Sequence, residues 1–540
     1  MAGSLVLAVT RVYQVDEAQT VYMASVLARG WTKVLYTSGQ LHLFPLSWLV
    51  RPGMDSAQLF MVFRIAFWAL FWVNAALAVV AAGLNLRTSA GLKALVAVGS
   101  LAPWWAYGLE IRHDNVLLTG VMLLWILGRR VPSRCRTLVF FLLGVVALLL
   151  HACLFKSVAT WVPLCALLLV LEPGTWREKT RLGACWAVGA LAAWAFAFGM
   201  NGWAGLTGNL QEGPAALNMV RSVARFPPWR TLQMLLATAP LLTAALLGLI
   251  GHGVLSAVRQ GVFAAWRDAE GFPETVLFLV CTLAFFLNPT PFPYNLAVLS
   301  GAGMVALLAV GKPWLEPGAL KDLRGLPFLV AMVLVLHILP LFNRLTQLFS
   351  LTNDRQEYVM GMAEAFSAPG DPVFDTIGLV PTRKAPSFGW LINLTNVESF
   401  DRVSMTQSWG TQVPVVILPS YRLSYLRPVD MAFITANYVA LRKDFWVLGR
   451  SWTKGRTEDA WTCLRTGRYA IIPDQPGNPG LELDGKPLAP GIYPIQEGKH
   501  TLRLAPDRPC WVAWVGPTLA EAPQMLTEGA SSVCPVPGDF

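Results

Sequence analysis

The sequence predicts a mainly α-helical membrane protein of about 10–12 transmembrane helices, followed by an outer α/β region and a small β module. Two observations predict this class. Of the 540 residues, 55% are hydrophobic and only 14% are charged, whereas about a quarter of the residues in soluble domains are charged. Long apolar stretches recur along residues 1–345, and more polar sequence with many turn residues follows them.

Ten apolar stretches are long enough to cross the membrane, because a transmembrane helix needs about 17 to 25 predominantly apolar residues. They are 58–85, 92–109, 113–128, 137–153, 157–171, 182–200, 231–251, 273–288, 293–310 and 326–343. A further span is expected at the start, where "MAGSLVLAV" is apolar but too short to cross. Either the true start lies upstream or this first span is stunted.

The charge of the short loops predicts the orientation. "NLRTSAGLK", "GRRVPSRCR" and "PGTWREKTR" carry Lys and Arg on one side of the membrane if the spans alternate, and that side is the cytoplasm. Topology therefore explains the net charge of +10, and no nucleic-acid partner is predicted. The Ala, Arg and Trp content favours a bacterial inner membrane, with a cytoplasmic N-terminus and a periplasmic C-terminal domain.

The composition divides the chain into two predicted domains. Residues 1–345 form the membrane domain, with outer loops at 11–57 and 201–230, and residues 346–540 form the periplasmic domain. Its first part alternates short apolar runs with turn residues, as in "TQVPVVILPS", which predicts an α/β fold. Asp-Gly, Pro-Gly and Glu-Gly turns then predict a small antiparallel β module at about residues 478–520.

The eight cysteines have no metal-ligand spacing, so no structural zinc is predicted. Cys463, Cys510 and Cys534 lie in the outer domain. One pair of them could form a disulfide in an oxidising compartment, and the sequence does not choose the pair.

The stretch "QVDEAQTVYMASVLARG" predicts a helix that starts at Asp16 and Glu17 and ends at Gly30. Acidic residues suit a helix N-terminus because they accept hydrogen bonds from its free amides and complement its dipole. Topology places this helix at the outer membrane surface, next to the interfacial segment "HLFPLSW". Two interpretations remain open: a helix cap, and a carboxylate pair that carries chemistry.

A second cluster lies in "YGLEIRHDNVLL", which places Glu110, Arg112, His113 and Asp114 in a tight turn between two spans. Ionisable groups at a membrane edge are unfavourable and tend to be functional or paired. The cluster is therefore either a functional site or a structural ion group in which Arg112 neutralises its acidic neighbours. The spans themselves carry few charges, with Arg64 as one exception.

Other candidates lie on the same side of the membrane. Lys156, at the outer end of two spans, is either an anion contact or a lysine that snorkels to water. In "NPTPFPYN", three prolines force an extended turn that presents Tyr294 and Asn295 outward. This turn is either a binding element or a rigid connector.

Two more features complete the candidate set. The outer loop 201–230 contains Arg221 and Arg225, although outer loops normally lack surplus positive charge. This exception indicates an anion-binding loop. His42 lies outside with no His, Cys or carboxylate near it in the sequence, so a metal role has little support.

The Asp-Glu pair followed by "LARG", the segment "HLFPL" and the second acidic turn together resemble the GT-C superfamily of integral-membrane glycosyltransferases. The pattern is most similar to the protein O-mannosyltransferase and aminoarabinose transferase types. The resemblance covers residues 1–345 and the general plan of a C-terminal outer domain. It implies an enzyme that takes one sugar from a polyprenyl-phosphate donor and transfers it to an acceptor on the outer side.

The resemblance also implies roles for the candidate residues. A base must take the acceptor hydroxyl proton, which is the role expected of Asp16, with Glu17 as its catalytic neighbour. Cations must stabilise the charge that develops on the leaving lipid phosphate. The expected cations are Arg112, Lys156, Arg221 and Arg225. The other expected substrate-binding residues are Glu110, Asp114, Tyr294, Asn295 and His42.

The sequence leaves several points open. No glycine-rich phosphate loop follows a strand, which is consistent with a lipid-linked donor. No cofactor is certain, and the sequence does not decide whether a divalent metal takes part. The acceptor is a protein, a lipid or a polysaccharide. A transporter or flippase of lipid-linked sugars and a non-catalytic envelope assembly subunit are the two alternative functions.

Overall fold

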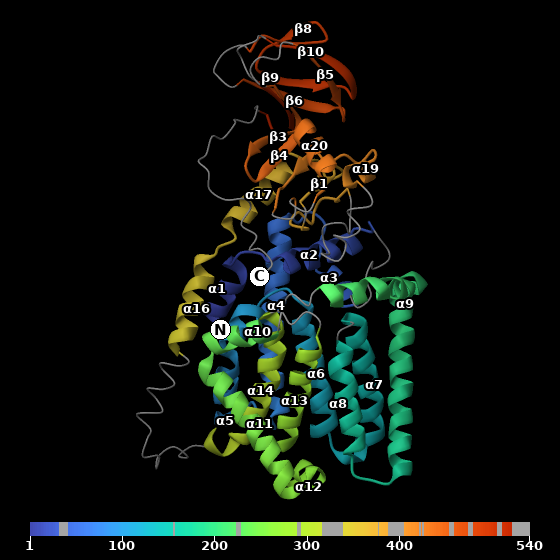
Figure 1. Cartoon of the computed structure of the whole chain (residues 1–540), viewed down its shortest axis with the longest axis vertical. Helices are drawn as coiled ribbons and strands as arrows, with labels where there is room; N and C mark the ends of the chain where they lie inside the picture. The colour runs from blue at the N-terminus through green and yellow to red at the C-terminus, as the bar shows by residue number, and fades with distance from the viewer. Residues whose placement is uncertain are drawn as a thin grey trace. The chain divides into compact units, whose positions relative to one another are not determined.

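A computed structural model gives the fold of the chain (Figure 1). It describes residues 1–31, 41–154, 157–222, 228–288, 293–315, 338–375, 377–386, 404–420, 423, 426–452, 458–473, 479–504 and 510–520. The chain forms two compact units. Unit 1 comprises Met1–Arg11, Thr32–Pro45 and Phe63–Leu351, and unit 2 comprises Val12–Trp31, Leu46–Val62 and Thr352–Phe540.

The secondary-structure elements of unit 1 are helices among its described residues. Its helices are α1 (Ala2–Thr10), α5 (Ser89–Gly99), η1 (Trp104–Gly108), α6 (His113–Arg130), η2 (Ser133–Cys135), α7 (Arg136–Cys153), α8 (Val158–Val170), α9 (Trp176–Ser222), α10 (Pro228–Thr238), α11 (Pro240–Gln260), α12 (Val262–Asp268), α13 (Phe272–Leu287), η5 (Pro293–Asn295), α14 (Leu296–Val310), η6 (Lys312–Leu315) and α16 (Leu339–Ser350). Two further helices, α3 (Leu43–Ser47) and α4 (Ser56–Ala81), each contribute residues to both units. In Figure 1, α6, α7 and α8 run side by side.

Several described helices have the length and composition of membrane spans. Five qualify: α4, α7, the Trp176–Met200 part of α9, α11 and the stretch Pro293–Val310. A sixth is added if α12 and α13, which meet at a bend of 118°, count as one broken span. The apolar helices α5 and α8 are shorter. Most of the predicted span 326–343 lies outside the described residues.

The predicted span 92–109 is interrupted in the structure. Helix α5 ends at Gly99, and the π-helical turn η1 begins at Trp104. Pro103 lies between them. A proline has no N–H to donate, and its ring clashes with the carbonyl four residues earlier, which belongs to Gly99.

Part of the predicted outer loop 201–230 is helical. Helix α9 continues to Ser222, and α10 begins at Pro228. The sequence "PAALNM" within this segment is rich in Ala, Leu and Met, which are strong helix formers. The glycines of this segment do not by themselves prevent a helix, because a glycine inside a helix costs only about 1 kcal/mol relative to alanine.

Close helix packing stabilises unit 1. Trp104, Trp125 and Phe71 are at most 1% exposed and lie in one apolar core. Between α7 and α9, a Cβ atom added to Gly144 would lie 2.0 Å from the Trp186 carbonyl oxygen. Glycines at such a contact let two helix backbones approach closely, as is common in membrane proteins.

Unit 2 contains two β-sheets (Figure 1). The first has the strand order β1-β2-β4-β11-β6-β9, with β3 paired to β4, and the second has the order β5-β10-β7-β8. Only β1 and β2 pair in parallel among the described strands. The strands are β1 (Val373–Phe374), β2 (Val416–Ile417), β3 (Tyr438–Arg442), β4 (Phe445–Trp452), β5 (Glu458–Cys463), β6 (Gly467–Pro473), β7 (Leu481–Leu483), β8 (Lys486–Leu488), β9 (Gly491–Ile495), β10 (Gly498–Arg503) and β11 (Cys510–Val515).

The C-terminal strands extend further than the sequence predicts. Strands β7 to β11 lie within the predicted module at 478–520, but β9, β10 and β11 pair with β4, β5 and β6, which precede it. The Asp-Gly turn between β7 and β8 forms as predicted. Asp484 and Gly485 have φ angles of 50° and 75°, as a type I′ hairpin turn requires.

The helices of unit 2 include α2 (Val15–Ala28), α17 (Asp354–Ala365), α19 (Met405–Trp409) and α20 (Pro428–Asn437). Helix α2 carries Asp16 and Glu17 and belongs to the same compact unit as residues 352–540. Cys463 and Cys510 are both buried free thiols, and Cys534 lies outside the described residues.

Candidate functional site

Asp16 and Glu17 lie in the first turn of α2, which confirms the predicted helix N-terminus. Glu17 forms a capping box with Gln14, whose backbone N–H donates to Glu17 Oε2 at 2.8 Å. Glu17 is fully buried, whereas Asp16 is half-buried. Glu17 therefore closes the helix end, and Asp16 is the more accessible carboxylate of the two.

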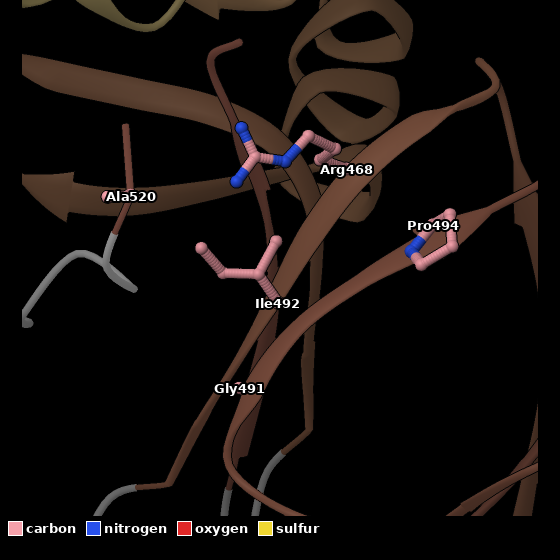
Figure 2. A pocket seen from close by; sticks show the side chains of 5 residues that line it. All are labelled: Arg468, Gly491, Ile492, Pro494 and Ala520. Atoms are coloured by element: carbon pink, nitrogen blue, oxygen red, sulfur yellow. The ribbon is translucent and has the colours of Figure 1, made fainter. Parts of the chain in front are cut away.

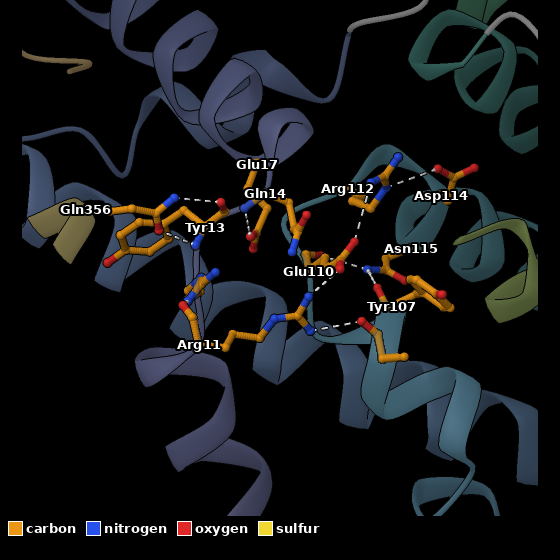
Figure 3. A network of polar contacts seen from close by, with 12 residues as sticks. Arg11, Tyr13, Gln14, Glu17, Tyr107, Glu110, Arg112, Asp114, Asn115 and Gln356 are labelled. Atoms are coloured by element: carbon orange, nitrogen blue, oxygen red, sulfur yellow. Dashed lines mark hydrogen bonds and ion pairs between the residues drawn. The ribbon is translucent and has the colours of Figure 1, made fainter. Parts of the chain in front are cut away.

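Residues of α17 hold the chain that enters α2, as Figure 3 shows for Tyr13 and Gln356. The Tyr13 backbone N–H donates to Gln356 Oε1 at 2.6 Å, and Gln356 Nε2 donates to the Tyr13 carbonyl at 3.0 Å. The Tyr13 hydroxyl donates to Glu357 Oε1 at 2.6 Å and accepts from Asn353 Nδ2 at 2.8 Å. The start of α2 is thus anchored by several contacts within unit 2.

A buried ion cluster lies in unit 1, and we call Arg11, Glu110, Arg112 and Asp114 the Arg112 cluster (Figure 3). Arg11 pairs with Glu110 Oε1 and donates to the Ala106 carbonyl at 2.9 Å. Arg112 Nη1 lies 3.4 Å from Glu110 Oε2, and Arg112 Nε lies 3.8 Å from Asp114 Oδ2. All four residues are at most 6% exposed.

Neutral polar residues fix the turn that carries this cluster. Asn115 Nδ2 donates to the Glu110 carbonyl at 2.8 Å. Asn74 Nδ2 in α4 donates to the Asn115 carbonyl at 3.0 Å, and Thr119 donates to Asn74 Oδ1 at 2.7 Å. These hydrogen bonds hold the Glu110 carbonyl and the first turn of α6, and thereby fix the backbone on either side of Arg112.

Arg112 also contacts the predicted turn at residues 293–295. Its guanidinium carbon lies 3.4 Å from the centre of the Tyr294 ring. Asn295 is 7% exposed and accepts a hydrogen bond from Asn288 Nδ2 at 3.3 Å. The structure therefore brings Tyr294 against the neighbouring pair Glu110 and Arg112 within unit 1, although Tyr294 is distant from them in the sequence.

His42 lies close to the same cluster. The His42 and His113 rings are 6.4 Å apart, and His113 Nε2 is 3.4 Å from Asp114 Oδ2. Burial lowers the pKa of His42 to about 4, outweighing the contrary effects of the Cys153 backbone and the Asp114 charge. At neutral pH the ring is therefore uncharged and offers one donor and one acceptor. Among the described residues, no group of three or more His, Cys, Asp or Glu side chains could hold a metal ion.

Arg64 lies next to the Arg112 cluster. It is fully buried in α4 and donates to the Arg11 carbonyl. Three buried arginines, Arg11, Arg64 and Arg112, thus lie in or beside this cluster. Buried guanidinium groups of this kind suit a phosphate or carboxylate ligand.

The structure does not describe every predicted cation. Lys156 and Arg225 lie outside the described residues, and only the backbone of Arg221 is described, as part of α9. Sequence reasoning did not select Arg11 and Gln356. Arg11 directly follows the apolar sequence of α1, which is a usable signal, whereas a lone glutamine in a polar segment gives none.

A pocket of about 430 Å³ lies in unit 2 (Figure 2). It is lined by Arg468, Gly491, Ile492, Pro494 and Ala520. The Arg468 guanidinium donates to the carbonyls of Gly516, Pro517 and Leu519. Because its N–H groups donate to backbone carbonyls, the Arg468 side chain has a structural role.

Comparison with protein-family models, curated proteins and solved structures found no match for this chain. Its chemistry is therefore inferred from its own residues. Among the described residues, two groups are candidates for a functional role: the acidic start of α2 in unit 2 and the Arg112 cluster in unit 1. The first offers an accessible carboxylate, and the second offers buried guanidinium groups beside a neutral histidine.

Proposed function

We propose that the protein is a membrane glycosyltransferase of the GT-C type. It transfers one sugar from a polyprenyl-phosphate donor to an acceptor on the periplasmic side of the inner membrane. The observation that carries this proposal is the Arg112 cluster, in which Glu110 and Asp114 hold a buried arginine against Tyr294. A planar guanidinium held in this way suits a lipid phosphate.

Exposed apolar side chains support the membrane location. Val188 and Leu191 on α9 are 57% and 64% exposed, and Val258 on α11 is 77% exposed. Such surfaces are unfavourable in water but match the hydrocarbon of a bilayer. In this proposal, α1, α5, α6, α8 and the apolar sequence near 326–343 join the five or six long candidate spans, which gives about 10–12 spans.

Charge development explains the role of the arginines. When the sugar–phosphate bond breaks, negative charge grows on the leaving lipid phosphate, and preorganised cations stabilise it. Arg112 is the main cation, with Arg11 beside it through their shared partner Glu110. Lys156, Arg221 and Arg225 remain further candidates. The carboxylates Glu110 and Asp114 hold the guanidinium groups in place.

Asp16 is the proposed general base. It is the half-buried carboxylate at the N-terminus of α2, where the helix dipole favours a negative charge. An ionised carboxylate can accept the proton of an acceptor hydroxyl as the oxygen attacks the anomeric carbon. Glu17 supports Asp16 by closing the helix end. His42 and Asn295 offer neutral hydrogen-bonding groups for sugar hydroxyls.

A flippase of lipid-linked sugars is the second candidate function. Arg64, a fully buried charge within the long apolar helix α4, favours it, because transporters place ionisable groups inside their spans. A flippase would move the donor across the bilayer without breaking the sugar–phosphate bond. The two functions therefore differ in one measurable product, free polyprenyl phosphate.

The test uses purified protein in proteoliposomes loaded with undecaprenyl phosphate carrying labelled mannose, arabinose or aminoarabinose. A cell-envelope extract supplies the acceptors, and release of undecaprenyl phosphate is measured. We expect Asp16→Asn and Arg112→Met to abolish release. Asp354→Asn, in the first turn of α17, and Arg259→Met, exposed on α11, are matched controls that should retain it.

Three outcomes contradict the proposal in different ways. Normal turnover by Asp16→Asn would remove the base assignment. Movement of intact donor between leaflets, without release of undecaprenyl phosphate, would favour the flippase. No turnover of any donor, together with unchanged envelope glycans by mass spectrometry in cells lacking the gene, would overturn glycosyl transfer.

A further inference from the structure

We propose that Gln356 is a positioning residue for Asp16, because its side-chain amide fixes the backbone that leads into α2. This inference rests on the proposed function, in which Asp16 is the general base. It assigns to the C-terminal part of the chain a direct role in placing a group near the N-terminus. Both residues belong to unit 2.

The evidence is a two-point contact between one side chain and one backbone unit (Figure 3). Gln356 Oε1 accepts from the Tyr13 N–H at 2.6 Å, and Gln356 Nε2 donates to the Tyr13 carbonyl at 3.0 Å. Gln356 is fully buried. Because both ends of the amide act on the same residue, the contact fixes the orientation of the Tyr13 backbone as well as its position.

The chain from Tyr13 to Asp16 is short and tightly held. Gln14 follows Tyr13, and its N–H is held by Glu17 in the capping box. The Tyr13 ring packs 4.2 Å from the Phe60 ring. Only three peptide bonds separate Tyr13 from Asp16. A shift of the Tyr13 backbone therefore moves the first turn of α2 and with it the Asp16 carboxylate.

Glutamine is the side chain that this contact requires. Its amide carries an acceptor and a donor at one end, as the N–H and C=O of one residue demand. A methionine has the same length but offers neither hydrogen bond of that strength. A glutamate keeps the acceptor and, when ionised, loses the donor. The Gln356 side chain thus makes the two hydrogen bonds to the Tyr13 backbone that a residue of a neighbouring β-strand would make in a sheet.

Catalytic geometry explains why such an anchor affects the reaction. A displacement of about 1 Å at a catalytic group can reduce the rate about 100-fold. Binding of the lipid-linked donor does not depend on the base being aligned. Loss of the anchor should therefore lower kcat and leave the KM for the donor nearly unchanged.

The test is Gln356→Met in the full-length protein, reconstituted with whichever labelled undecaprenyl-phosphate sugar the wild type turns over. We expect kcat to fall about 10- to 100-fold, with the donor KM within about twofold of wild type. Hydrogen–deuterium exchange should become faster in the peptide covering residues 12–20 and should stay unchanged in the β-sheets. This exchange measurement does not depend on activity.

Gln58→Met is the matched control. Gln58 is also a glutamine of unit 2 whose side chain accepts from a backbone N–H, that of Asp55 at 3.3 Å, but it is exposed and lies at the start of α4. This variant should keep normal kcat and normal exchange at residues 12–20. If Gln356→Met does not fold, Gln356→Glu serves instead, because it retains the acceptor for the Tyr13 N–H.

The outcomes separate this inference from the proposed function. Normal kcat and normal exchange at residues 12–20 in Gln356→Met would overturn the positioning role. A fall in kcat that is matched by global loss of thermal stability would also overturn it, in favour of a general structural role. If Asp16→Asn has normal turnover, the proposed function fails, whereas the exchange result for Gln356→Met still stands.

Discussion

The Arg112 guanidinium lies over the Tyr294 ring, with its central carbon 3.4 Å from the ring centre. Glu110 and Asp114 flank the same guanidinium at 3.4 and 3.8 Å. The Tyr294 ring and the two carboxylates thus all contact the same guanidinium group. The proposed phosphate contact therefore depends on an aromatic residue that carries no charge.

The first prediction concerns this stacked pair. Tyr294→Leu should lower donor turnover about tenfold or more, because a desolvated cation–π contact contributes about 2 kcal/mol. Tyr294→Phe keeps the ring and should retain most of the activity. Arg112→Lys keeps the charge but loses the planar guanidinium group, which can donate two parallel hydrogen bonds. Its turnover should therefore fall as well. Release of undecaprenyl phosphate measures all three, and equal activity of the Leu and Phe variants would contradict the stacking role.

The second prediction separates the two acidic residues of α2. Glu17→Ala should destabilise the protein by about 1 kcal/mol, because it removes one half of the capping box. Asp16→Asn should leave thermal stability nearly unchanged but abolish donor turnover, because Asp16 is half-buried and its proposed role is chemical. Thermal unfolding in detergent and the turnover assay measure the two effects. A greater loss of stability in Asp16→Asn than in Glu17→Ala would reverse these roles.

The third prediction concerns helix packing between α7 and α9. Gly144→Ala and Gly189→Ala should each destabilise the protein by about 1–3 kcal/mol, because each added Cβ would lie 2.0 Å from a carbonyl oxygen of the facing helix. Gly248→Ala in α11 is the matched control, since nothing lies within 4 Å of its added Cβ. That control should be neutral or slightly stabilising. Equal melting temperatures for all three variants would refute the close approach.

The fourth prediction concerns the pH dependence of the second sheet of unit 2. His500 Nδ1 lies 2.7 Å from Asp484 Oδ2, and Nε2 lies 2.8 Å from the Gln496 carbonyl. Burial lowers the pKa of His500, but these hydrogen bonds and the charge of Asp484 outweigh it, so the pKa is raised above 6.5. The hydrogen bonds from His500 and Thr501 lower the pKa of Asp484 below 3.8.

The sign of the effect follows from these two shifts. A raised histidine pKa contributes stability below pH 6.5, which is lost as the pH rises through the folded-state value. A lowered aspartate pKa contributes stability above pH 3.8, which is lost as the pH falls. The difference in melting temperature between wild type and His500→Gln should therefore be largest between pH 3.8 and pH 6.5. A difference that grows from pH 6 to pH 9 would contradict the ion pair.

Local features were predictable from the sequence. The start of α2 follows from two acidic residues before an apolar run, and the Asp484-Gly485 turn follows from a dipeptide that adopts positive φ at low cost. The helices of unit 1 follow from the length of their apolar stretches. Each of these features depends on residues within a few positions of one another. The functional roles of the candidate residues stay predictions.

Local hydrophobic patterns and turn residues are enough to predict where most helices and the C-terminal strands form. The pairing of Glu110 with Arg11 and the contact of Arg112 with Tyr294 arise only when the helices pack. The same holds for the contact between Gln356 and Tyr13 at the start of α2. These contacts join residues far apart in the chain, and their energies depend on burial and geometry, which exist only after the helices and strands have packed.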